Sequence, residues 1–348
     1  MKKLFALLLT AAMLFALLGC GAKDPVDTPD PGAPDPGTSD PGPTAVSWPN
    51  SAVQLVVAYA AGGGTDLTAR TLSEALSKSG NFGVVNNTDG GGVIGWEQVR
   101  TSDPAICDQL IFALNSMFVT YLSQVSDIDP MSDIQPVFAM DGNIAYFVVV
   151  NKDAPYDTLD EMIAYGKEHP GELTLGAGAP GSTMTILTSQ FLASTGLDCS
   201  LVATSGSDAD AVAMVMGGNM SCYLTNQTTT QNYLEAGEVK VLASVLPISD
   251  KSVEIIRAIP TLEDLGYENC TMGTTFIVWA PVGADRAVYE RMNELFNAAL
   301  ADQAVQDSLA ERGCDYVSYG NFDETVARLQ SDYASAETAW NAYLASAG

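Results

Sequence analysis

The fold class is decided by residues 53–66, whose sequence is Val53-Gln54-Leu55-Val56-Val57-Ala58-Tyr59-Ala60-Ala61-Gly62-Gly63-Gly64-Thr65-Asp66. The first six residues are nearly all apolar and predict a buried β-strand. After the glycines, apolar side chains recur at helical spacing and predict a helix over 65–78. Consecutive glycines let the backbone approach a ligand closely, and the helix start offers N–H groups to an anion. The stretch therefore predicts a strand, an anion-binding loop and a helix in succession.

This glycine loop differs from the two common nucleotide-binding loops. No Gly-Lys-Ser/Thr sequence follows it, which excludes a P-loop. A Gly-x-Gly-x-x-Gly fingerprint that starts at Gly62 would need a glycine at position 67, where the chain has Leu67. Taken alone, the loop has a plain structural turn as its alternative interpretation.

Two further small, polar loops follow predicted strands. Gly176-Ala177-Gly178-Ala179-Pro180-Gly181-Ser182-Thr183-Met184-Thr185 leads into a predicted helix, and Ala203-Thr204-Ser205-Gly206-Ser207 follows a strand predicted near residue 200. Ligands of open α/β sheets bind at the carboxyl ends of strands. Together the three loops predict one ligand site that is built from N–H and O–H donors without a fixed cation.

Short β-rich segments alternate with helical segments through the rest of the chain. This alternation predicts an α/β fold with mostly parallel sheets. Thr158 and Glu161 have the spacing of a capping box, Asp285 is expected to cap another helix, and residues 322–344 are expected to form an amphipathic helix. Further strands are predicted over residues 110–113, 145–150, 173–177, 200–203, 221–225, 239–245 and 275–279.

The N-terminal segment has the features of an export signal. Two lysines precede an apolar run over residues 4–18 that is too short for an ordinary membrane span. It ends in Gly19-Cys20, which resembles the bacterial lipobox and predicts a signal peptide over 1–20 with lipidation of Cys20. An ordinary signal peptide with an incidental cysteine is the alternative. Residues 21–47 are rich in Pro, Asp and Gly, and they predict a disordered spacer rather than a partner-binding tract.

The charge balance excludes several classes of function. The chain has 15 Lys and Arg against 42 Asp and Glu, a formal net charge of -27. Nucleic-acid binding requires the opposite balance, and so does docking through a basic face on an anionic bilayer. His169 is the single histidine and is expected to be a surface residue at a helix end. Neither a metal site nor a cofactor is predicted.

The cysteines leave one question open. Cys20 is assigned to lipidation, so five remain, an odd number. Cys199 and Cys222 fall in predicted strands and are a candidate disulfide pair, which the sequence does not decide. The remaining three are Cys107, Cys270 and Cys314.

Several motifs occur in an order that is typical of one receptor family. They are Val56-Val57-Ala58-Tyr59-Ala60-Ala61-Gly62-Gly63-Gly64-Thr65-Asp66, Gly91-Gly92-Val93-Ile94-Gly95, Gly217-Gly218 ahead of Asn226, Leu242-Ala243, Pro260-Thr261-Leu262-Glu263-Asp264-Leu265-Gly266 and Trp279-Ala280-Pro281. On these motifs the segment from Trp48 to the C-terminus resembles the periplasmic solute-binding receptors of tripartite tricarboxylate transporters, the Bug or TctC-like family.

This resemblance implies a two-domain, periplasmic-binding-protein-like (Venus flytrap) fold with a hinge that the chain crosses twice. Domain 1 would comprise 48–150 and 273–348, and domain 2 would comprise 151–272. A small carboxylate would bind between the domains. The ligand-binding residues carried over from the family motifs are Tyr59, Ala60, Ala61, Gly62, Thr65, Asp66, Ser182, Thr183, Thr204, Ser205, Gly206 and Asn226.

The third loop departs from the family pattern. Where the family often has Pro-Tyr-Lys/Arg-Gly, this chain has Ala203-Thr204-Ser205-Gly206. A ring and a cation are absent, which leaves the identity of the ligand open. Asp66 has an alternative role, because a carboxylate at a helix start is favourable without any ligand.

The sequence thus predicts a monomeric, lipid-anchored receptor on the outer face of the cytoplasmic membrane, which delivers a small organic acid to membrane transporter subunits. It is not expected to be an enzyme. Two alternatives remain: a receptor that feeds a sensory system, and an exported hydrolase with Ser182 as nucleophile. The hydrolase would need a base near Ser182, and the chain has no Gly-x-Ser-x-Gly elbow.

Overall fold

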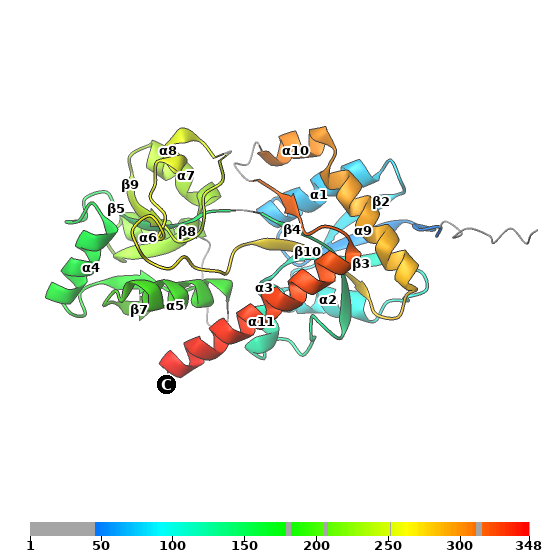
Figure 1. Cartoon of the computed structure of the whole chain (residues 1–348), viewed down its shortest axis with the longest axis horizontal. Helices are drawn as coiled ribbons and strands as arrows, with labels where there is room; N and C mark the ends of the chain where they lie inside the picture. Colours follow the sequence, from blue (N-terminus) through cyan, green and yellow to red (C-terminus); the bar gives the residue numbers. More distant parts are fainter. Residues whose placement is uncertain are drawn as a thin grey trace, which may run out of the picture. The chain divides into compact units, whose positions relative to one another are not determined.

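The chain folds around two β-sheets, each flanked by helices (Figure 1). The structure is a computed structural model that describes residues 46–142, 144–178, 182–204, 208–250, 252–310 and 315–347. The signal peptide, Cys20 and most of the spacer predicted for 21–47 lie outside these residues.

The first sheet has six strands in the order β11-β4-β10-β3-β1-β2 among the described residues. We call this sheet and its helices α1, α2, α3, α9 and α10 the first lobe. The strands are β1 Val53–Val57, β2 Phe82–Asn86, β3 Gln109–Leu114, β4 Ile134–Asp141, β10 Thr275–Pro281 and β11 Val317–Ser318. The helices are α1 Gly64–Leu76, α2 Val93–Arg100 after the short helix η1 Asp89–Gly92, α3 Ser116–Leu122, α9 Arg286–Leu300 and α10 Gln303–Ala310.

The second sheet has five strands in the order β7-β6-β8-β5-β9 within the same described ranges. We call this sheet and its helices α4 to α8 the second lobe. The strands are β5 Tyr146–Asn151, β6 Thr174–Gly176, β7 Ser200–Val202, β8 Cys222–Asn226 and β9 Val239–Ser244. The helices are α4 Leu159–Glu168, α5 Thr183–Thr195, α6 Asp208–Met216, α7 Gln227–Glu235 and α8 Glu254–Arg257, and the chain ends with α11 Phe322–Ala347.

Alternating side chains of the central strands face two different hydrophobic clusters. In β1, Leu55 and Val57 pack into one cluster and Val56 into another. In β5, Val148 packs into one cluster and Phe147 into a third. Successive side chains of a strand point to opposite faces of its sheet. Helices cover both faces, which explains why these strands are apolar throughout.

The α/β class is confirmed, but the sheets are mixed rather than mostly parallel. The pairs β1–β2, β1–β3, β6–β7 and β6–β8 are parallel, whereas β10 and β5 are antiparallel to both of their neighbours. The parallel pairs follow helical crossovers. Strands β5 and β10 each enter a sheet from the other lobe, a long-range return that local sequence does not reveal. The two-residue strand β11 is also antiparallel to its neighbour β4.

Three strands of the first sheet were not predicted from the sequence. Strand β2 has one buried residue, Phe82, followed by exposed and half-buried residues in alternation, and it lies at the edge of the sheet. Strand β4 contains Pro136, and prolines argue against a strand interior. Strand β11 has only two residues. All three have weak local signals and are defined by pairing with a neighbouring strand.

Most of the helix features predicted from the sequence are present in the structure. The Thr158 hydroxyl accepts from the Glu161 amide and the Glu161 carboxylate accepts from the Thr158 amide, so the predicted capping box is confirmed. The predicted terminal helix is α11. Asp285 is the N-cap residue of α9, but its side chain makes no capping hydrogen bond.

The chain crosses between the sheets twice, after β4 and before β10. Strand β5 pairs in the second sheet from Tyr146 onward, ahead of the boundary predicted at residue 150. The division into domains over 48–150, 151–272 and 273–348 therefore stays a proposal, with β5 assigned to the second lobe by its pairing.

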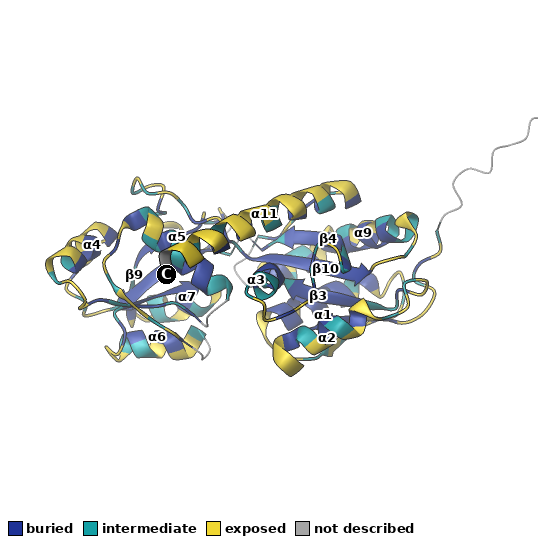
Figure 2. Cartoon of the chain, turned by 90° about the horizontal axis from the view of Figure 1, so that it is seen from below, coloured by how far each residue is buried: buried dark blue, intermediate teal, exposed yellow. Residues whose placement is uncertain are grey.

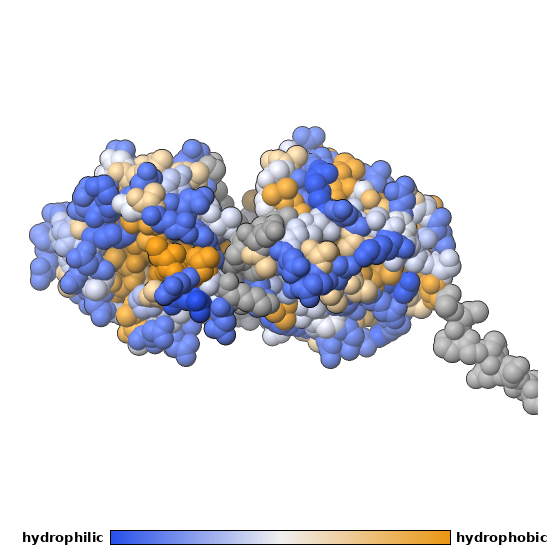
Figure 3. Space-filling view, turned by 90° about the horizontal axis from the view of Figure 1, so that it is seen from above, coloured by the Kyte–Doolittle hydropathy of each residue, from blue (hydrophilic) through white to orange (hydrophobic). Residues whose placement is uncertain are grey.

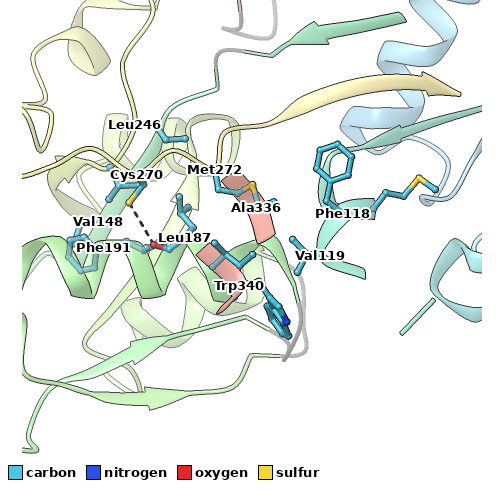
Figure 4. Packing of buried hydrophobic residues seen from close by; sticks show 14 of the residues in the cluster. Phe118, Val119, Val148, Leu187, Phe191, Leu246, Cys270, Met272, Ala336 and Trp340 are labelled. Atoms are coloured by element: carbon cyan, nitrogen blue, oxygen red, sulfur yellow. Dashed lines mark hydrogen bonds between the residues drawn. The ribbon is translucent and has the colours of Figure 1, made fainter. Parts of the chain in front are cut away.

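Helix α11 adds a further link between the lobes. It packs against β4 and α3 of the first lobe and against α5 of the second. Ala336 and Trp340 of α11 lie in one hydrophobic cluster with Phe118 of α3 and Leu187 of α5 (Figure 4). The opposite side of α11 is largely exposed (Figure 2).

The face of the molecule in Figure 3 is largely hydrophilic, with an apolar area on one lobe. No helix among the described residues is long and apolar enough to cross a membrane.

The candidate disulfide between Cys199 and Cys222 does not form in the structure. Both cysteines are free thiols. Strand β6 lies between β7, which Cys199 precedes, and β8, which contains Cys222. Two strand spacings amount to about 9.5 Å, which exceeds the reach of about 7 Å between the Cα atoms of a disulfide. Cys107 and Cys270 are also free, and Cys314 lies outside the described residues.

Candidate functional site

The first predicted loop lies at the carboxyl end of β1 and leads into α1. Ala60, Ala61 and Gly62 are exposed, whereas Tyr59 is half-buried and Thr65 is buried. Gly62 has a φ of 83°, in the left-handed region that glycine adopts without steric cost. The sequence therefore forms the predicted tight, accessible loop at the start of a helix.

Helix α1 presents hydrogen-bond donors at this loop. The first N–H groups of a helix have no acceptor within the helix, and the N-cap residue Gly63 has no side chain that could serve as one. The amide of Gly62 is already used, because it donates to Asp66 Oδ2 at 2.8 Å. The first turn of α1 can thus offer backbone donors and a positive dipole end to an anion.

Asp66 anchors the loop from within α1. Its side chain is 1% exposed. Oδ2 accepts from Gly62 N and from Arg70 Nε at 3.0 Å, and Oδ1 accepts from Asn86 Nδ2 at 2.9 Å and lies 2.9 Å from Arg70 Nη2. Asn86 Nδ2 also donates to the Tyr59 carbonyl at 3.0 Å. The network ties the loop to α1 and to the end of β2.

The pKa values around this loop follow from these contacts. The hydrogen bond from Arg70 is the main cause that lowers the pKa of Asp66 to about 2, with smaller contributions from Gly62 and Asn86. Burial raises the pKa of Tyr59, whose hydroxyl lies 2.9 Å from Ser116 Oγ. Asp66 is therefore an ionised structural anchor, with both oxygens occupied by protein donors.

Sequence reasoning missed two residues at this edge of the first sheet. Asn86 ends β2, and Ser116 begins α3 directly after β3. Both strands are parallel to β1, so their carboxyl ends lie at the same edge. The polar pair Asn115-Ser116 after a predicted strand was an available signal for Ser116, whereas β2 itself had not been predicted.

The second and third loops meet at the carboxyl edge of the second sheet. Thr204 N donates to the Gly178 carbonyl at 3.3 Å, which joins the loop after β6 to the loop after β7. Ser182 is the N-cap of α5, and its hydroxyl accepts from Thr185 N. The hydroxyl of Thr183 is buried and has no hydrogen-bond partner among the described atoms.

Asn226 brings β8 to the same edge. Its side-chain oxygen Oδ1 accepts from Thr229 N at 2.9 Å and so caps α7. Its side-chain nitrogen Nδ2 donates to Asp208 Oδ2 at 2.8 Å. Asp208 also accepts from the Tyr223 hydroxyl at 2.9 Å. Asp208 lies at the start of α6, where a solvated charge would be expected from the sequence, but it is half-buried and burial raises its pKa. Ser205 and Gly206 lie outside the described residues.

Each lobe thus gathers its predicted residues at one sheet edge. The hydrogen bonds described above join these residues to partners in their own lobe, so binding between the lobes remains a prediction. A cavity of about 350 Å³ lies elsewhere, against the crossing segment before β10 and against α11. None of the predicted binding residues lines it.

His169 and Ser182 do not form a catalytic pair in the described structure. His169 lies at the end of α4, where its ring stacks on Tyr165 with centroids 4.3 Å apart. Its Nδ1 is 3.6 Å from Glu172. The Ser182 hydroxyl instead caps α5, so the geometry offers no support for a hydrolase built on these residues.

Comparisons with known proteins agree with this architecture. The model of the tripartite tricarboxylate transporter family receptor matches residues 68–339. Protein BugT of Bordetella pertussis is 31% identical over 274 residues, which cover 78% of this chain and 82% of that protein. A UPF0065 protein of Cupriavidus necator is 30% identical over 273 residues, 77% of this chain and 80% of its own length.

Solved structures show the same fold. A solute-binding protein from Polaromonas, without ligand, superposes with a TM-score of 0.69 at 22% identity and covers 85% of this chain and 99% of its own. Rpa4515 of R. palustris, solved with adipate, has a TM-score of 0.69 at 25% identity and covers 85% of this chain and 98% of its own.

Two sheets with helices, joined by a twice-crossed connection, define the class of periplasmic-binding-protein-like solute receptors. Within that class, the chain belongs to the tripartite tricarboxylate transporter family of receptors. This is a family of solute-binding receptors and not a family of enzymes.

Proposed function

We propose that this protein is an exported, lipid-anchored receptor that binds a small carboxylate between its two lobes and delivers it to the membrane subunits of a tripartite transporter. The observation that carries the proposal is the glycine loop at the start of α1, which Asp66 holds in place and which leaves helix N–H groups for an anion. The adipate-bound relative supports a dicarboxylate as the ligand.

The proposed ligand-binding residues are the predicted ones. Tyr59, Ala60, Ala61, Gly62 and Thr65 would contact the ligand from the first lobe, whereas Asp66 would act through the loop. The second lobe would contribute Ser182, Thr183, Thr204, Ser205, Gly206 and Asn226. The Thr183 hydroxyl is buried and has no hydrogen-bond partner among the described atoms, so it is available to a ligand, which supports its place in this set.

Calorimetric titration of the purified protein tests the ligand class. Straight-chain dicarboxylates of increasing length, tricarboxylates, aromatic acids and amino acids would be compared at one pH and ionic strength. We expect binding of a dicarboxylate, with loss of binding when one carboxylate is replaced by a neutral amide. Binding only of phosphorylated or cationic solutes would contradict the carboxylate proposal.

Lipid anchoring is tested separately by fractionation. A Cys20→Ser variant should lose incorporation of a labelled fatty acid and leave the membrane fraction, while the same change at the buried Cys107 should leave both unchanged. Membrane retention of the Cys20→Ser variant would argue against the anchor. Loss of ligand uptake on deletion of the neighbouring membrane subunits would distinguish transport from sensing.

A further inference from the structure

Arg70 lies one helical turn beyond the start of α1, outside the set of predicted ligand contacts. Its guanidinium contacts both carboxylate oxygens of Asp66. Nε donates to Oδ2 at 3.0 Å, and Nη2 lies 2.9 Å from Oδ1. Nη2 also donates to Asn86 Oδ1 at 3.1 Å. Such a two-pronged contact fixes the carboxylate in orientation as well as in charge.

This ion pair is asymmetric in its exposure. The Arg70 side chain is 48% exposed, whereas the Asp66 side chain is 1% exposed. The buried member is therefore an anion, and it lies one hydrogen bond from Gly62 in the loop that is proposed to receive an anionic ligand. A buried carboxylate without a cation would repel a second anion at that distance.

We infer that Arg70 is a positioning residue for ligand binding, which cancels the charge of Asp66 and thereby makes the glycine loop able to accept a carboxylate. The inference rests on the proposed function. In this arrangement Asp66 fixes the conformation of the loop by accepting hydrogen bonds from Gly62 and Asn86. The positive charge of Arg70 offsets the repulsion between the Asp66 carboxylate and an anionic ligand. The ligand itself is bound by backbone donors, so no cation needs to touch it.

A double-variant cycle separates this role from simple structural support. Arg70→Gln should weaken dicarboxylate binding at least tenfold at pH 7, because the Asp66 charge is then uncompensated. Asp66→Asn combined with Arg70→Gln removes both charges and keeps one side-chain oxygen that can accept from the Gly62 amide, so the double variant should recover part of the affinity that Arg70→Gln loses. A merely structural role predicts that the double variant binds no better than Arg70→Gln alone.

The pH dependence supplies a second readout. In Arg70→Gln the main cause of the low Asp66 pKa is gone, so Asp66 should titrate closer to the ordinary aspartate value of about 4. Its protonation should then recover affinity as the pH falls from about 7 to below about 4. The ratio of affinities between Arg70→Gln and the double variant cancels any titration of the ligand. That ratio should approach one on acidification, and a constant ratio would contradict the inference.

Arg291→Gln is the matched control, since Arg291 forms a half-exposed ion pair with Glu294 within α9. It should leave affinity unchanged, and melting temperatures should confirm that all variants fold. A wild-type protein that binds no carboxylate would overturn the proposed function itself. Wild-type binding together with unchanged binding by Arg70→Gln would overturn only the role of Arg70.

Discussion

At the residue scale, the first loop depends on one glycine and one acid that have different tasks. Gly62 adopts a backbone conformation that L side chains rarely adopt, and an added Cβ would meet no atom within 4 Å. Asp66 is buried and holds the Gly62 amide. The glycine is therefore required for the path of the backbone, and the acid for keeping that path fixed.

Gly62→Val should abolish carboxylate binding while the protein still folds. The positive φ is strained for a β-branched residue by about 2 kcal/mol, so the loop would change its path. Calorimetric titration should show at least a hundredfold loss of affinity. Gly171→Val is the control, since Gly171 has a φ of 80° and equally open surroundings at the far end of α4; it should show the same strain with normal binding.

Asp66→Asn should reduce the free energy of unfolding at pH 7 by about 1–3 kcal/mol, since a charged acceptor for Gly62 and Arg70 is lost. The Asp66 pKa is about 2 in the folded protein, below the ordinary value of about 3.9. Its stabilising contribution is therefore complete above about pH 5 and lost progressively as the pH falls through about 4 to below about 2. Denaturation curves of wild type and variant should converge over that interval, and a constant difference would contradict the assignment.

At the scale of elements, the sequence predicted where helices begin more accurately than it predicted the strands at the sheet edges. The capping box at Thr158 and the terminal helix were predicted because each is encoded by residues close together in the sequence. Strands β2, β4 and β11 were missed because an edge strand, a proline-containing strand and a two-residue strand are stabilised by their neighbours. Asn86 was missed together with β2, since its position depends on β2 pairing beside β1.

Thr158→Ala should lower the free energy of unfolding by about 1 kcal/mol, the usual cost of losing an N-cap hydroxyl. Thr338→Ala serves as the control, because this exposed threonine bonds only within the interior of α11. Chemical denaturation should place the control within about 0.5 kcal/mol of the wild type. Equal effects of the two changes would show that the capping box contributes no more than an ordinary surface hydroxyl.

At the scale of the whole molecule, α11 joins the two lobes through a shared hydrophobic cluster. Trp340 is 9% exposed and lies in the cluster that contains Phe118 of the first lobe and Phe191 of the second. Closure of a two-lobed receptor requires the lobes to move about their connections. The position of this cluster makes α11 part of that connection as well as part of the core.

Trp340→Ala should therefore lower the free energy of unfolding by about 3 kcal/mol and broaden the thermal transition, because the lobes would unfold less cooperatively. Leu344→Ala is the control, since Leu344 is 51% exposed on the same helix. Differential scanning calorimetry would measure both effects. An unchanged transition in Trp340→Ala would show that α11 does not couple the lobes.

The sequence by itself determined the α/β class, the strand–glycine–helix unit at residues 53–66 and the family, because each depends on residue order over short distances. It also placed Ser182, Thr204 and Asn226 at strand ends. Only the tertiary structure decided that the sheets are mixed, that Cys199 and Cys222 are separated by β6, and that Asn86 at the end of β2 donates to Asp66. These features depend on which strands lie side by side and which side chains meet across them, and distant pairing of this kind leaves no periodic trace in the chain.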